Sequence, residues 1–164
     1  MDRSEPWKSL SRQSRVVVLI VLSLVLIAGS LFLTDRKDFD IIVVTFPNGR
    51  AIEAEVADTP EKLLFGLAFR EGLPPDSGML YIFETSDRYR MHTKGFKIPV
   101  DMIWVDESRH VVHMVEGAGP CSQDPCPLYG PPPENARYVI QTQAGFIKQE
   151  GLAPGMELKF ALRL

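Results

Sequence analysis

One uncharged stretch sets the outer limits on how this chain can fold. Residues 16–33 contain no charged side chain, and they follow a leader that carries four basic residues. The 18 residues of this stretch would span about 27 Å as a helix at ~1.5 Å per residue, close to the ~30 Å apolar core of a bilayer. We therefore expect a transmembrane helix at residues 16–33, with the folded domain after it.

The same stretch also fits a cleaved secretory signal peptide. In that interpretation residues 16–28 form the apolar region, and Ala-Gly-Ser at 28–30 is an imperfect small-residue cleavage site. Leu-Phe-Leu at 31–33 prolongs the apolar run past that site, which favours an uncleaved anchor. Basic flanks stay in the cytoplasm, so both interpretations export the remainder of the chain. We expect a single-pass protein of the inner (cytoplasmic) membrane, with its domain on the periplasmic or extracellular side.

The chain divides into a leader at 1–15, the anchor at 16–33, a linker at 34–39 and one domain at 40–164. The leader has a formal charge of +2, so the rest of the chain has −5, because the whole chain has −3. A mildly acidic body has no basic face for a phosphate backbone. We therefore expect the membrane, and no nucleic acid, among the partners.

The domain begins with a hairpin and a short helix. Residues 40–46 are an apolar, β-branched run, Pro-Asn-Gly follows at 47–49, and residues 51–57 alternate between polar and apolar, as in two strands joined by a tight turn. A helix is expected at 61–70, where leucines recur at helical spacing. Asp58 or Thr59 can cap it, and Pro60 suits its first turn.

Strands dominate the rest of the domain. No regular alternation of strands and helices is present, so we expect an α+β, mainly β fold: a small, mostly antiparallel, barrel-like sheet with one or two short helices. A second helix is expected at 146–150, ended by Gly151. The further strand-like runs are 79–84, 100–106, 110–116, 137–143 and 156–164.

Cys121 and Cys126 lie in one short Pro-rich loop. In an exported domain the default is a disulfide, which on closing so short a loop would stabilise by about 2 kcal/mol. A metal site with His110 and His113 is the alternative, and a redox-active dithiol is a second. The four-residue gap is looser than a C-x-x-C pair, and strand alternation turns the two histidines to opposite faces. We expect no metal and no cofactor.

Four motifs carry a family resemblance: VADTPEKLLFGLAFREGLPPDSGMLYIF, KGFKIPVDMIWVD, GPCSQDPCPLYG and APGMELKF. In this order they resemble the bacterial and archaeal family known as domain of unknown function 192, over roughly residues 40–164. The resemblance implies a compact β-rich domain, often exported or membrane-anchored, with no established activity.

The chain departs from the family pattern at one point. Lys94, Pro99 and Asp101 match it, whereas His92 stands where the family has tryptophan and Thr93 where it has methionine. The aromatic platform that the family pattern implies for a ligand is therefore not carried over, and His92 is peculiar to this chain.

Asp101 interrupts the apolar run IPVDMIWVD at 98–106. A buried carboxylate is costly without a partner, and Arg70, His92 and Lys94 are the candidates. In a structural role, Asp101 accepts hydrogen bonds from Arg70 or from nearby backbone and holds loop 84–99 against the sheet. In a functional role, the four residues form the polar end of a pocket for a small ligand or a chain terminus.

Two classes of function fit this cluster. The first is a non-catalytic module that binds a small anionic ligand or an exported protein through Arg70, His92 and Lys94. The second is an exported enzyme in which His92, oriented by Asp101, acts as general acid/base on a small ester or sugar-derived substrate. No nucleophile, second carboxylate or metal set lies at a motif-grade spacing nearby, which favours binding.

Overall fold

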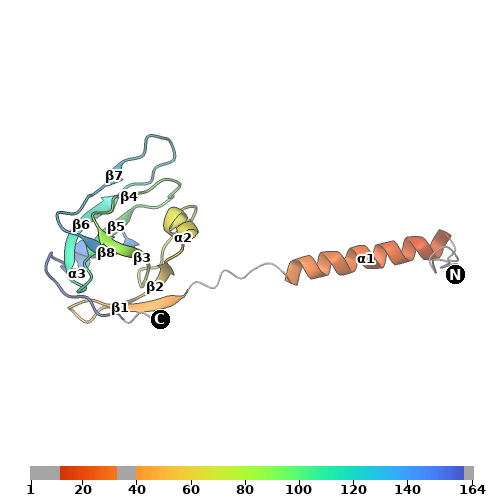
Figure 1. Ribbon diagram of the computed structural model, residues 1–164, viewed down its shortest axis with the longest axis horizontal. Helices are drawn as coiled ribbons and strands as arrows, with labels where there is room; N and C mark the ends of the chain where they lie inside the picture. The colour runs from red at the N-terminus through yellow and green to blue at the C-terminus, as the bar shows by residue number, and fades with distance from the viewer. Residues whose placement is uncertain (1–11, 33–39, 161–164) are drawn as a thin grey trace. The chain divides into compact units, whose positions relative to one another are not determined.

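The computed structural model describes residues 12–32 and 40–160 (Figure 1). It separates into two units, residues 1–38 and residues 39–164. The predictions for residues 1–11, 33–39 and 161–164 fall outside the described residues.

The first unit contains helix α1, Arg12–Phe32. The large apolar side chains between Val16 and Leu26 are exposed within it. In the part of the chain that the structure describes, no helix has the length and apolar character that crossing a membrane requires.

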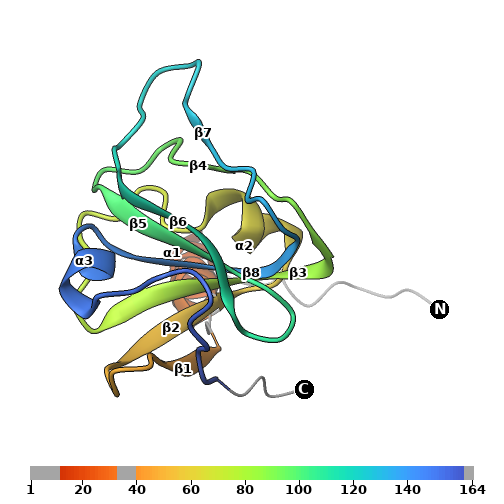
Figure 2. The same ribbon diagram turned by 90° about the vertical axis from the view of Figure 1, so that its left-hand side faces the viewer.

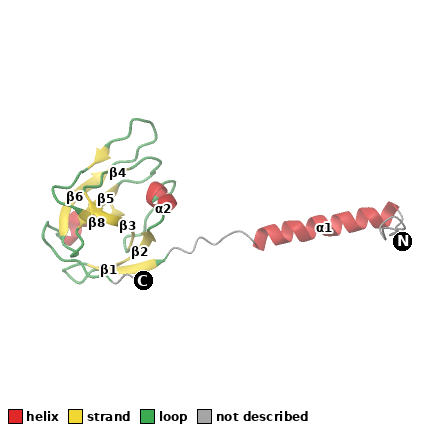
Figure 3. Ribbon diagram, in the orientation of Figure 1, coloured by secondary structure: helices red, strands yellow, loops and turns green. Residues whose placement is uncertain are grey.

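The second unit is built on a six-stranded mixed sheet (Figures 1 and 3). All neighbouring pairs are antiparallel except β2 and β3, whose parallel pairing requires a crossover that contains α2. The strands, in sheet order, are β1 (Ile41–Thr45), β2 (Ala51–Ala57), β3 (Ser77–Asp87), β8 (Ala136–Gln143), β5 (Val100–Val105) and β6 (Val111–Ala118).

Two further strands form a small separate sheet, β4 (Met91–His92) with β7 (Leu128–Tyr129). This pair lies at the opposite end of the domain from β1 (Figures 1 and 2). Sequence reasoning missed both strands, because two-residue strands are too short to show any period.

The predicted hairpin and both predicted helices are present. Helix α2, Pro60–Phe65, begins with Thr59, whose side chain accepts a hydrogen bond from the Lys62 amide. It is shorter than the predicted 61–70, because Gly66 has φ 48° and ψ −121° and ends it. Helix α3, Phe146–Glu150, ends at Gly151 with φ 61°, as expected.

The predicted barrel-like closure is wrong, because the sheet is open, with β1 and β6 as its edges. Residues 156–160 do not form the predicted strand. Thr45 and Lys159 exchange backbone hydrogen bonds of 2.8 and 2.9 Å, whereas the Leu158 amide donates to Arg109. The segment therefore divides its bonds between the two edges and forms only isolated bridges, since one short segment cannot build a continuous ladder with both.

Both faces of the sheet are buried. Alternation along β5 turns Ile103 and Val105 into one hydrophobic cluster and Met102 and Trp104 into the other. The first cluster includes residues of α3, and we call its side of the sheet the α3 face. The second packs against Leu63 of α2 and defines the α2 face. The two helices lie on opposite sides of the domain (Figure 1).

Asp101 is fully buried on β5, and alternation places it on the α3 face with Ile103. Its Oδ1 accepts a 2.7 Å hydrogen bond from the Gly117 amide, and its Oδ2 accepts one of 2.9 Å from the Ile147 amide. The carboxylate thus connects β5 to the end of β6 and to the start of α3. This is a structural role with backbone donors, but it holds β6 and α3, and not loop 84–99.

The Asp101→Asn variant tests this role. Asparagine presents one acceptor oxygen and one NH₂ group, so one of the two backbone donors, Gly117 and Ile147, loses its partner. We expect the free energy of unfolding to fall by about 2–3 kcal/mol in urea titrations. The control is Asp124→Asn, which removes an exposed ion pair with Lys94 and should change stability by less than ~1 kcal/mol. Equal stability of both variants would contradict the assignment.

Candidate functional site

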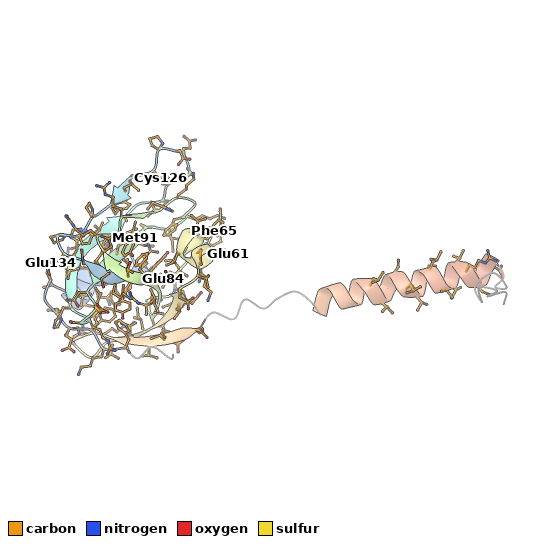
Figure 4. The ribbon with its side chains drawn as sticks, viewed as in Figure 1. Glu61, Phe65, Glu84, Met91, Cys126 and Glu134 are labelled. Carbon is orange, nitrogen blue, oxygen red and sulfur yellow. A yellow bond between two sulfur atoms is a disulfide. The ribbon has the colours of Figure 1, made fainter. Side chains whose placement is uncertain are left out.

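The domain surface is hollowed beside α2, and we call this hollow the α2 groove. It has a volume of about 100 Å³. Phe65 and Met91, which Figure 4 labels, contribute from α2 and from β4. We call residues 90–96, which include β4, the β4 segment. The lining residues of the groove are Leu63, Leu64 and Phe65 of α2, Tyr81 and Phe83 of β3, and Arg90, Met91, His92 and Phe96 of the β4 segment.

The α2 side of the groove is unusually apolar for a surface. Leu64 is 60% exposed, Phe65 47% and Phe69 66%. The Phe69 amide donates to Gly95 at 2.8 Å, and a Cβ on Gly95 would lie 3.4 Å from the Phe69 ring. Phe69 also has a positive φ of 66°, which is uncommon for a bulky residue. Phe69 is therefore held by Gly95, and its ring lies 6.4 Å from that of Phe65. We call these three exposed apolar side chains the rim.

Tyr81 forms part of the groove floor. It is buried, and its hydroxyl donates a 2.8 Å hydrogen bond to Gln141 Oε1. Burial raises the pKa of the Tyr81 phenol well above its ordinary value, so the side chain stays neutral at physiological pH. Gly66 permits this arrangement, since a Cβ at that position would lie 1.7 Å from the Tyr81 oxygen.

The structure does not unite the four residues of the predicted cluster. Arg70 forms a two-pronged ion pair with Glu55, with both N–O distances at 2.5 Å. This hydrogen bonding to Glu55 raises the pKa of Arg70, outweighing the opposite effect of burial. Glu55 lies between Ala54 and Val56 of the α3-face cluster, so alternation places its side chain on the α2 face.

His92 and Lys94 lie at the β4 segment. His92 lines the groove, and its Nδ1 accepts a 3.3 Å hydrogen bond from the Lys94 amide. Lys94 Nζ pairs with Asp124 at 2.6 Å. Asp101 lies on the α3 face, so the sheet separates it from the Arg70–Glu55 pair. The cluster prediction is corrected accordingly: the buried Asp101 was expected to need Arg70, His92 or Lys94 as a partner, but its side chain points to the other face and accepts from backbone amides.

Sequence reasoning missed Arg90 and the apolar rim. Arg90 is exposed and lines the groove, and among the described residues it has no hydrogen bond or ion pair through its side chain. One signal was present: residues 63–65 are three consecutive apolar residues in a short helix, and they cannot all face one core.

The predicted disulfide between Cys121 and Cys126 is present, with Cα atoms 5.8 Å apart. Its loop packs against the β4 segment. The Gly95 amide donates to Cys121 at 2.9 Å, and Thr93 Oγ1 donates to Gly119 at 2.7 Å. The disulfide loop therefore supports the side of the groove that carries His92. No group of three or more metal-binding side chains occurs within residues 12–32 and 40–160.

The model of the DUF192 family, described as "Uncharacterized ACR", matches residues 43–160. The chain belongs to the DUF192 family. No protein of curated function matches it.

Two solved structures share the fold of this DUF192 domain. A Sinorhizobium meliloti 1021 protein, provisionally described as a transcription regulator, is 25% identical with a TM-score of 0.66, over 77% of this chain and 98% of its own. A protein of unknown function from Novosphingobium aromaticivorans DSM 12444 is 24% identical with a TM-score of 0.63, over 74% of this chain and 84% of its own. The second likeness concerns the fold alone.

Removing the disulfide should loosen one side of the groove. We expect the Cys121→Ser/Cys126→Ser variant to lose about 2 kcal/mol of unfolding free energy, because the loop that the bond closes is short. Amide hydrogen exchange should accelerate at residues 91–96 and stay unchanged in β8, since the loop bonds to the first segment. A uniform acceleration across the domain would contradict this local role.

A double-mutant cycle tests the contact between Gly66 and Tyr81. Gly66→Ala should destabilise by about 2–5 kcal/mol, from overpacking of about 1–3 kcal/mol and backbone strain at positive φ of about 1–2 kcal/mol. Tyr81→Phe removes the clashing oxygen, so Gly66→Ala should cost less in that background. Gly72→Ala is the control, because a Cβ there meets nothing within 4 Å. Strictly additive effects would exclude the contact.

Proposed function

We propose that this DUF192 protein is an exported, non-catalytic binding module whose binding surface is the α2 groove. One observation carries the proposal. Outside α1, six large apolar side chains are exposed among the described residues, and three of them form the rim: Leu64 and Phe65 line the groove, and Phe69 lies beside Phe65. A hollow next to clustered exposed apolar side chains is typical of an interaction surface.

The geometry supports binding over acid/base catalysis. A catalytic histidine needs a group that orients it, and Asp101 was the candidate. Both oxygens of Asp101 accept from backbone amides on the α3 face, and His92 Nδ1 accepts from the Lys94 amide. The alternative function as an enzyme depended on Asp101 orienting His92, and these two residues are not paired.

The size of the groove favours a protein segment over a small ligand. Pockets for drug-sized ligands usually enclose ~300–1,000 Å³, whereas this one has about 100 Å³. A volume of this size accommodates a single apolar side chain, and the exposed rim extends the contact beyond it. A small set of buried anchors typically supplies most of the affinity of such an interface.

Export and membrane attachment through residues 16–33 are part of the proposal. The uncharged run behind a basic leader supports them, and so does the disulfide, because such bonds persist in oxidising compartments. The Sinorhizobium meliloti description suggests DNA-related regulation as an alternative. The formal charge of −5 on residues 16–164 argues against nucleic-acid binding by this chain.

A peptide selection tests the groove. The full chain in lipid nanodiscs is the bait for a random peptide library displayed on phage, and the affinity of the selected peptides is then measured. We expect the Leu64→Ser/Phe65→Ser variant to bind them at least tenfold more weakly, because two apolar contacts are lost.

The matched control is Ile41→Ser/Val43→Ser, which removes two exposed apolar side chains of β1. It should bind the selected peptides as the unchanged chain does, and circular dichroism should show both variants folded. If no peptide is enriched, or if the groove variant binds as well as the control, the proposal is overturned.

A further inference from the structure

We infer that the partner of the α2 groove presents an apolar side chain next to a carboxylate, and that Arg90 recognises this carboxylate. The inference rests on the proposed function and adds the chemistry of the partner. It comes from an imbalance of charges around the groove.

Other cations near the α2 face have carboxylate partners within the chain. Arg70 pairs with Glu55, Lys94 with Asp124 and Lys97 with Glu71. Arg90 differs, because in residues 12–32 and 40–160 no ion pair or side-chain hydrogen bond involves it, although it lines the groove. A cation that no carboxylate of the described residues pairs with is available to a carboxylate of a partner.

The backbone that carries Arg90 is held on both sides. Before it, the Tyr89 ring stacks on Phe83 with centroids 3.8 Å apart, and the Tyr89 carbonyl accepts a 2.9 Å hydrogen bond from Trp104 Nε1. After it, Met91 pairs with Tyr129 of β7 and is buried. The backbone position of Arg90 is therefore set before a partner arrives, so binding does not have to order this part of the chain.

Glu84 is an acidic residue close to the groove in sequence, since it follows Phe83 on β3. Phe83 packs on the α2 face and lines the groove, whereas Ile82 packs on the α3 face. Glu84 does not line the groove, and no ion pair among the described residues joins its carboxylate to Arg90.

The apolar surroundings strengthen a charge contact at Arg90. Phe83, Met91 and Phe96 line the groove beside it, and a partner side chain placed against them excludes water from the guanidinium. An arginine–carboxylate pair with two parallel hydrogen bonds is stronger and more selective in such a setting. Arginine next to aromatic residues is also a common composition of binding hot spots.

The test extends the selection experiment to charge. From the unchanged chain we expect peptides in which an acidic residue, or the terminal carboxylate, lies within about three positions of an aromatic or aliphatic anchor. The Arg90→Glu variant should bind them at least tenfold more weakly, and a new selection on it should enrich Lys or Arg near the same anchor. Lys148→Glu, the same charge change on α3, is the control and should have no effect.

The outcomes separate the two proposals. If Leu64→Ser/Phe65→Ser abolishes binding but Arg90→Glu does not, or if the selected peptides are apolar without acidic residues, only the carboxylate inference is overturned. If the groove variant leaves binding intact, the proposed function fails first. Synthesis of each peptide with a free or an amidated end distinguishes a terminal carboxylate from an acidic side chain.

A lipid surface is the rival partner for an apolar rim with a cation. Vesicles of phosphatidylglycerol that bind the chain through Leu64, Phe65 and Arg90, with no peptide enriched, would overturn the inference in favour of membrane contact.

Discussion

The domain depends on one constraint, which is that its sheet must be covered on both faces. Every residue of β5 is buried, so each side chain of this central strand has to meet a packed layer whichever way it points. One layer contains α3 and residues 152–160, and the other contains α2 and the small sheet formed by β4 and β7. The buried carboxylate of Asp101 is tolerated in this strand because two backbone amides donate to it.

The groove forms because the layer on the α2 face covers the sheet less completely than the layer on the α3 face. Helix α2 has six residues and buries none of them completely; the chain is anchored next to it by Leu67, which is fully buried. Gly66 ends the helix and allows the backbone to turn directly over Tyr81. The outer leucine and phenylalanine of the helix are left in solvent, and the disulfide loop completes the opposite side. A binding surface thus forms where a short helix covers a sheet incompletely.

Much of the local structure was readable from residue patterns. The hairpin, the capped start of α2, the second helix with its terminal glycine and the Cys121–Cys126 bond all depend on short-range chemistry, and all are present. The end of α2 was misplaced, because the periodic leucines continue past the glycine that stops the helix. The final strand was also misjudged, since its pattern is correct but its hydrogen-bonding partners lie on two different edges.

At the candidate site, the difference between what local sequence predicts and what long-range packing decides is larger than in the rest of the fold. The sequence by itself determined the family, the class of fold and the residues that have to find partners, because these depend on composition, order and local spacing. Only the tertiary structure decided which partners they find. Asp101 occupies a position on β5 whose side chain points to the α3 face, away from His92. Arg70 pairs with Glu55, which lies fifteen residues earlier on β2. Arg90 is unpaired at the groove among the described residues. These outcomes depend on which faces of distant strands meet, and no local pattern encodes that.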